Sequence, residues 1–177
     1  MTVLRIGIPP FVLEVTIDDL QQLGKAINRL LKKNNFDGYY NVIAKHSGKC
    51  LDVAFSSTEN NANVFQYTLH NTENQKWVFV KTPDGYYSIF AKHSGKCLDI
   101  EGYEHNDFAN VWQYAFHNGI NQKWELRDVG NGYFNIIAKH SGKALDVSYS
   151  SQDDEANIIL YTLNNTENQQ WKLMPVK

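Results

Sequence analysis

A nine-residue string that carries His, Ser, Lys and Asp occurs three times in this chain. It reads AKHSGKCLD at residues 44–52 and again at residues 91–99, and AKHSGKALD at residues 138–146. Side chains of these types could bind a metal ion or form a Ser-His-Asp catalytic triad. Each copy must therefore be placed in its structural element before either chemistry is accepted.

The local context of each string opposes both chemistries. Every His lies in a KHSGK segment, between lysines that would repel a divalent cation, so we predict tight turns at His46, His93 and His140 and no metal ligands. Side chains this close in a turn diverge, and an enzyme rarely carries three copies of its nucleophile. Glycoside hydrolysis needs two carboxyl groups, whereas each copy has one recurring carboxylate. The sequence predicts no metal, no cofactor and no catalytic activity.

The strings belong to a longer repeat of constant period. Asp52, Asp99 and Asp146 are spaced by 47 residues, and a Trp recurs at the same interval. The period divides the chain into units 38–84, 85–131 and 132–177, each with four short runs of alternating apolar and polar residues. Three such units can close around an axis, share one core and leave no exposed strand edge. A propeller blade also has four strands, but three blades are fewer than the roughly four to eight of a propeller.

A Gln-x-Trp motif closes each unit: Gln75-Lys76-Trp77, Gln122-Lys123-Trp124 and Gln169-Gln170-Trp171. Three such motifs at constant spacing, each preceded by Leu-Asp and a Val/Ile-x-x-Tyr run, resemble the ricin-type lectin domain over residues 38–177. The resemblance implies an all-β fold, a β-trefoil of about twelve strands with three-fold pseudo-symmetry. It also implies that the chain binds carbohydrate. We expect each Trp to belong to the core, because it follows a polar loop and begins an apolar strand.

The repeated residues suit the recognition of a sugar ring. Strand alternation puts Phe65 and Tyr67 on one face, and Tyr114 and Tyr161 follow at the same position in the later units. An aromatic ring can cover the apolar face of a pyranose, while carboxylate and amide groups bind its hydroxyls. The resemblance maps the sites to these residues, with the Gln of each motif bracing the Asp: Asp52, Tyr67, His70, Asn74 and Gln75; Asp99, Tyr114, His117, Asn121 and Gln122; Asp146, Tyr161, Asn164, Asn168 and Gln169.

One position departs from the family pattern. The residue two places before the stacking Tyr is often a sugar-binding Gln in this family, but here it is Phe65, Trp112 or Ile159. The change removes one hydrogen bond to the ligand and widens the apolar platform.

Composition narrows the class of partner. The net charge is −2, with 17 basic and 19 acidic residues, which does not favour nucleic acid or an anionic membrane. Cys50 and Cys97 occupy the same place in the first two units, and Ala144 occupies that place in the third. A disulfide between them would have no equivalent in the third unit, so we expect free, buried thiols in a reducing compartment. The N-terminus makes a poor signal peptide, and no apolar run approaches the roughly 20 residues of a membrane span. We expect cytoplasmic synthesis, with action there or on external glycans after release.

The first 37 residues lie outside the repeat. Residues 2–8 and 11–16 are predicted to form strands, and a capping box at 16–19 opens a predicted helix that ends near Lys33. Its apolar stripe is too small to form a core alone. We expect this N-terminal segment to assemble chains into a homo-oligomer. The open alternatives are that it packs on the trefoil of its own chain, or that it is a truncated or membrane-active segment.

The sequence thus predicts a non-catalytic lectin with up to three sites, one per unit, acting by multivalent avidity. Galactose or N-acetylgalactosamine glycans are the ligands that the resemblance suggests. The alternative is a protein-interaction or toxin-targeting trefoil whose sugar sites are vestigial.

Overall fold

The computed structural model describes residues 3–8, 11–16 and 36–177, and the chain divides into two compact units, Met1–Asp37 and Gly38–Lys177. In the first unit, β1 (Val3–Ile8) pairs antiparallel with β2 (Phe11–Thr16), with Val3 opposite Thr16 and Ile8 opposite Phe11. These strands were predicted from the sequence. The predicted helix that ends near Lys33 lies outside the described residues.

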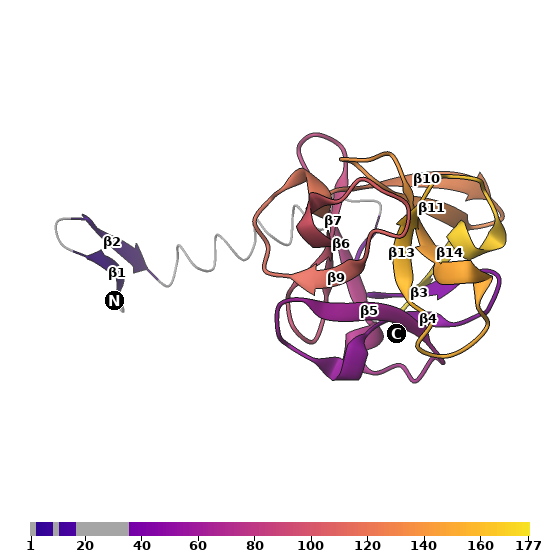
Figure 1. The fold of residues 1–177 in the computed structure, drawn as a ribbon. Helices are drawn as coiled ribbons and strands as arrows, with labels where there is room; N and C mark the ends of the chain where they lie inside the picture. The colour runs from indigo at the N-terminus through magenta and orange to yellow at the C-terminus, as the bar shows by residue number, and fades with distance from the viewer. Residues whose placement is uncertain (1–2, 9–10, 17–35) are drawn as a thin grey trace. The chain divides into compact units, whose positions relative to one another are not determined.

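The second unit is an all-β fold of three lobes, and each lobe contributes four strands, as predicted (Figure 1). The first lobe contains β3 (Tyr40–Ala44), β4 (Cys50–Val53), β5 (Ala62–Tyr67) and β6 (Trp77–Lys81). The second contains β7 (Tyr87–Ala91), β8 (Cys97–Ile100), β9 (Val111–Tyr114) and β10 (Trp124–Gly130). The third contains β11 (Tyr133–Ala138), β12 (Ala144–Val147), β13 (Ile158–Tyr161) and β14 (Trp171–Pro175).

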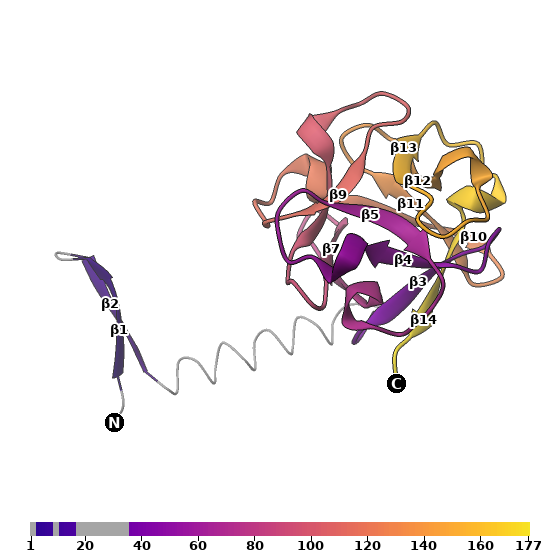
Figure 2. The same ribbon diagram turned by 60° about the horizontal axis from the view of Figure 1, so that its bottom comes forward.

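The lobes are closed into one body by pairing between the last strand of one lobe and the first strand of another. β6 pairs with β7, β10 with β11, and β14 returns to β3, so that the end of the chain completes the first lobe (Figure 2). Within each lobe the second and third strands form a separate hairpin: β4–β5, β8–β9 and β12–β13. This pairing is a β-trefoil, and the closure leaves each outer strand with a partner.

The core contains the Trp residues of the Gln-x-Trp motifs, as predicted. Trp77, Trp124 and Trp171 are fully buried, and each indole N–H donates to the backbone carbonyl of the Leu in the Leu-Asp pair of its own lobe, at 2.9, 3.2 and 3.1 Å. A buried indole needs this acceptor. The bond ties the last strand of each lobe to the strand that carries the Asp.

The two cysteines are free and buried, which confirms that part of the expectation. Cys50 and Cys97 are fully buried at the start of β4 and β8, and Ala144 is fully buried at the same place in β12. Burial raises the pKa of the Cys50 thiol to about 12 and that of Cys97 still further. No helix among the described residues is long and apolar enough to cross a membrane.

Candidate functional site

A surface pocket lies in each lobe, at equivalent positions around the trefoil. The pockets of lobes one, two and three have volumes of about 270, 490 and 260 Å³. Four predicted residues line each pocket: Asp52, Tyr67, His70 and Asn74; Asp99, Tyr114, His117 and Asn121; Asp146, Tyr161, Asn164 and Asn168. The structure therefore brings these twelve predicted site residues together as three sets.

A buried carboxylate forms the floor of the first pocket. Asp52 lies on β4 and is 5% exposed; its Oδ1 accepts a bond from Asn74 Nδ2 at 2.7 Å, and its Oδ2 accepts one from Gln75 Nε2 at 2.7 Å. The short 3-10 turn η2 (Glu73–Gln75) places both amides beneath the carboxylate. Gln75 Oε1 in turn accepts the backbone N–H of His70 at 2.8 Å. The floor is thus held from below, as the predicted bracing requires.

The third lobe repeats this floor. Asp146 accepts bonds from Asn168 Nδ2 and Gln169 Nε2, both at 2.8 Å. Burial raises the pKa of Asp52 and of Asp146 to about 6, and the amide hydrogen bonds oppose that rise without cancelling it. The carboxylates remain mostly ionised at neutral pH but lose charge in mildly acidic solution.

The Gln residues lie beneath the pocket surface, where residues predicted to brace the Asp are expected. Gln75, Gln122 and Gln169 are fully buried and line none of the three pockets. They position the Asp and the following loop. Gln122 Oε1, for example, accepts the backbone N–H of His117 at 2.9 Å, as its counterparts do in the other lobes.

An unpartnered acceptor lies beside the carboxylate in two lobes. The Oδ1 atoms of Asn74 and Asn121 are buried and have no hydrogen-bond donor among the described residues. In the third lobe, Asn168 Oδ1 instead accepts the hydroxyl of Thr166 at 2.6 Å. A buried acceptor without a donor is costly unless a ligand supplies one. Asn74 and Asn121 are therefore suited to receive a ligand hydroxyl.

Aromatic side chains form the pocket walls, and some were not predicted. Phe65 and Tyr67 line the first pocket with ring centroids 5.9 Å apart, as alternation along β5 predicts. Phe55 and Tyr149 were missed: both line pockets, are 88% and 86% exposed, and have a φ of 55°. A left-handed residue interrupts the alternation on which the sequence prediction depends. Their position in the repeat could have indicated them, since both follow Leu-Asp-Val by two residues.

The second pocket differs at its carboxylate. Trp112 Nε1 donates to Asp99 Oδ1 at 3.0 Å, and His117 Nε2 lies 3.2 Å from Asp99 Oδ2. Asn121 Nδ2 also donates to Oδ1, at 3.0 Å. Trp112 was predicted to widen the apolar platform, and it does line the pocket, but its N–H is directed to the carboxylate. A ligand at this site would compete with the protein's own donors.

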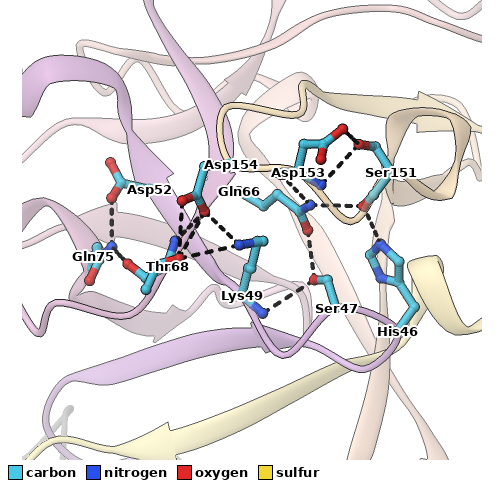
Figure 3. Close-up of polar contacts among 10 residues, drawn as sticks. All are labelled: His46, Ser47, Lys49, Asp52, Gln66, Thr68, Gln75, Ser151, Asp153 and Asp154. Carbon is cyan, nitrogen blue, oxygen red and sulfur yellow. Dashed lines mark hydrogen bonds and ion pairs between the residues drawn. The ribbon is translucent and has the colours of Figure 1, made fainter.

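The His of the repeated string contacts a neighbouring lobe, whereas the Ser contacts a residue of its own lobe. His46 Nε2 lies 2.9 Å from the carbonyl of Ser151 in the third lobe, and Ser47 donates to Gln66 Oε1 at 2.7 Å (Figure 3). His93 and His140 reach the carbonyls of Ser57 and Glu104 at 2.8 Å. The turns were predicted, and Gly48 has the expected positive φ of 70°. Their role in joining neighbouring lobes was not predicted.

Comparison with known proteins identifies the family. The model of the ricin-type beta-trefoil lectin domain matches residues 38–171, and the chain therefore belongs to that family. No curated protein matches the sequence.

Solved structures agree with this assignment. The designed three-fold symmetric protein ThreeFoil is 50% identical, with a TM-score of 0.78, covering 79% of this chain and 100% of that one. An exo-beta-1,3-galactanase from Clostridium thermocellum is 34% identical, with a TM-score of 0.77, covering 81% of this chain but only 31% of the enzyme. A ricin B-like lectin of Macrolepiota procera, solved with lactose, shares the fold at 19% identity and a TM-score of 0.68, covering 78% of this chain and 95% of that one.

Proposed function

We propose that the trefoil binds galactose-type glycans through its three pockets without cleaving them. The observation that carries the proposal is the pairing, in one pocket, of the ionised Asp52, the unpartnered Asn74 Oδ1 and the ring of Tyr67. The carboxylate and the amide can accept hydroxyl hydrogen bonds, and the ring can cover the apolar face of a pyranose. The lactose in the Macrolepiota procera lectin supports a galactoside as the first ligand to test.

Binding without hydrolysis is supported by the state of the carboxylate. The first pocket contains a second acid, Glu155, so two carboxyl groups are present. Both oxygens of Asp52, however, accept amide N–H bonds from Asn74 and Gln75, which oppose the rise in pKa caused by burial; that pKa is about 6, so Asp52 is mostly ionised at neutral pH. A glycosidase needs one of its two acids to hold a proton and donate it to the leaving oxygen. The pocket suits an acceptor of hydroxyl bonds better than a general acid.

The arrangement of the pockets supports multivalent binding. A shallow site for a single sugar is expected to have a Kd of about 1 mM, or roughly −4 kcal/mol. Three sites on one rigid body can raise avidity for a clustered glycan by about 100- to 10,000-fold. We also propose that residues 1–37 assemble chains and multiply the sites further; a solution mass measurement with and without these residues tests that part.

The test is titration of the protein with lactose, followed on a glycan array. Replacing Tyr67, Tyr114 and Tyr161 together by Ala removes the stacking rings and leaves the buried carboxylate network intact. We expect the triple variant to stay folded and to lose binding. Tyr39→Ala is the matched control, because Tyr39 is 37% exposed and lines none of the three pockets. Failure of the wild type to bind any glycan would refute the proposal and favour a protein-interaction module, and sugar release from a chromogenic galactoside would indicate an enzyme.

A further inference from the structure

Each pocket is completed by one residue from a different lobe. Glu155 of the third lobe lines the first pocket, Asn61 of the first lobe lines the second pocket, and Phe108 of the second lobe lines the third pocket. These three residues are spaced by 47 positions and therefore occupy the same place in the repeat. We call the residue at this place the lip residue of the pocket. The carboxylate and the stacking Tyr recur in every pocket, whereas the lip residue is different in each.

The backbone holds all three lip residues in one conformation. Asn61, Phe108 and Glu155 have positive φ angles of 65°, 69° and 64°. Each backbone N–H donates to a carbonyl of the lobe whose pocket it lines: that of Gln113 at 3.0 Å, of Leu160 at 2.9 Å and of Gln66 at 2.9 Å. An acid, an amide and an aromatic ring are therefore presented from equivalent backbone positions. Glu, Asn and Phe side chains are thus all accommodated at this position with a positive φ.

The residues that precede Glu155 fasten its loop to the first lobe. Gln66 Nε2 donates to the carbonyls of Ser151 and Asp153, each at 2.8 Å, and Asp154 Oδ1 accepts the backbone N–H of Thr68 at 2.7 Å (Figure 3). Figure 3 shows this loop lying across Gln66 and Thr68, with Asp52 farther along the same lobe. The loop backbone is held independently of the Glu155 side chain, so a change of that side chain acts on the ligand rather than on the loop.

We propose that the lip residue donated by the neighbouring lobe sets the ligand class of each pocket. The inference rests on the proposed carbohydrate function. In the first pocket, Glu155 adds a second carboxylate to Asp52, and Tyr67 and His70 are the other titratable groups among the lining residues. Two acids in one small pocket repel an anionic ligand. The first pocket selects neutral saccharides over sulfated or carboxylated ones.

The third pocket has the opposite character. The ring of Phe108 lies 5.6 Å from that of Tyr149 and 5.3 Å from that of Tyr161, centroid to centroid. Asp146 is its only charged lining residue. The cluster offers aromatic rings beside Tyr161, on which a second pyranose can stack while the first covers Tyr161. The third pocket tolerates anionic substituents and gains affinity from a disaccharide over a monosaccharide.

The experiment uses full-length chains in which two lobes are silenced by Tyr→Ala, leaving lobe one or lobe three. Lactose, monosulfated lactose and galactose are the probes, titrated at low salt. With lobe one active, we expect sulfated lactose to bind about three- to tenfold more weakly than lactose, and high salt to reduce the difference. Glu155→Gln should bring the two affinities within about twofold. Asp153→Asn is the matched control: it removes one charge from the same loop at a residue outside the pocket lining, and it should leave the discrimination unchanged.

An exchange of lip residues completes the test. Phe108→Glu, with lobe three active, should create discrimination against sulfated lactose and reduce the preference for lactose over galactose by about threefold or more. Equal binding of both lactoses by lobe one, or discrimination that survives Glu155→Gln, would overturn the inference while leaving carbohydrate binding in place. An absence of binding to any neutral glycan would instead refute the proposed function and this inference with it.

Discussion

Gln75 connects the carboxylate of Asp52 to the loop that follows the stacking Tyr. Its Nε2 donates to Asp52 Oδ2 at 2.7 Å and to the carbonyl of Thr68 at 2.9 Å, while its Oε1 accepts the backbone N–H groups of His70 and Asn71 at 2.8 and 3.0 Å. A fully buried amide that satisfies four partners cannot be replaced by an apolar residue without leaving some of them unpaired.

Replacing Gln75 by Ala should therefore affect binding and stability together. We expect loss of sugar binding at the first lobe and destabilisation of about 2–4 kcal/mol, because a buried carboxylate and two backbone N–H groups lose a partner. Urea unfolding and lactose titration of a lobe-one-only chain measure the two effects. Gln152→Ala, at an exposed residue, should change stability by no more than about 0.5 kcal/mol. A Gln75→Ala protein with unchanged stability would show that the bracing contributes little.

Sugar binding should weaken in mild acid. The pKa of Asp52 and Asp146 is raised by burial to about 6, so each carboxylate gains a proton as the pH falls through that value. Protonation removes acceptor capacity toward a sugar hydroxyl, and lactose affinity at lobes one and three should decrease between pH 7 and pH 5.

The third lobe is the control for histidine in that experiment. His70 lines the first pocket, but Asn164 occupies its place in the third, so a chain with only lobe three active should show the same midpoint. Affinity that stays constant down to pH 4.5 in lobe three would contradict the role given to Asp146.

The free energy of unfolding should change with pH in the opposite direction to sugar affinity. The pKa of an Asp in the unfolded chain is about 3.9, so the folded chain retains more protons between about pH 4 and 6. The free energy of unfolding therefore falls as the pH rises through that window.

The contact between Gln66 and the loop of the third lobe should contribute more than the ion pair beside it. Gln66→Leu copies Leu160, the natural residue at this place in the third lobe. It leaves the carbonyl of Asp153 without its donor and the carbonyl of Ser151 with His46 alone. We expect a loss of about 1–3 kcal/mol in urea unfolding. Lys49→Met removes the ion pair to Asp154 at 2.7 Å and should cost only about 0–1 kcal/mol. If both variants lost the same free energy of unfolding, burial of the Gln66 amide would not explain the strength of the contact.

The thiols should be inert in the folded protein. Cys50 and Cys97 are fully buried, and burial raises the pKa of Cys50 to about 12. A disulfide exchange reagent at neutral pH should leave both cysteines unmodified until urea unfolds the chain. Cys50→Ala should fold normally, since Ala144 fills the same core position in the third lobe. Rapid modification of native protein at both sites would imply that the core opens readily.

Much of the fold and part of each site follow from the sequence. The constant spacing of 47 residues, the Gln-x-Trp motifs and strand alternation place Asp52, Tyr67 and Asn74 in one lobe, because they depend on contacts within a single repeat. The burial of the tryptophans and the free cysteines follows from the same periodicity.

Only the tertiary structure revealed the contributions between lobes. His46 meets Ser151 across 105 residues of sequence, and Glu155 reaches the pocket of Asp52 from the neighbouring third lobe. Repeat periodicity shows which residues are equivalent, but not which neighbour each one faces once the lobes close. The capping of Asp99 by Trp112 was hidden for a related reason, since the direction of a side-chain donor depends on its rotamer and surroundings. The sequence by itself determined a three-lobed trefoil with an acid and a ring in each lobe, and closure of the trefoil decided how those three pockets differ.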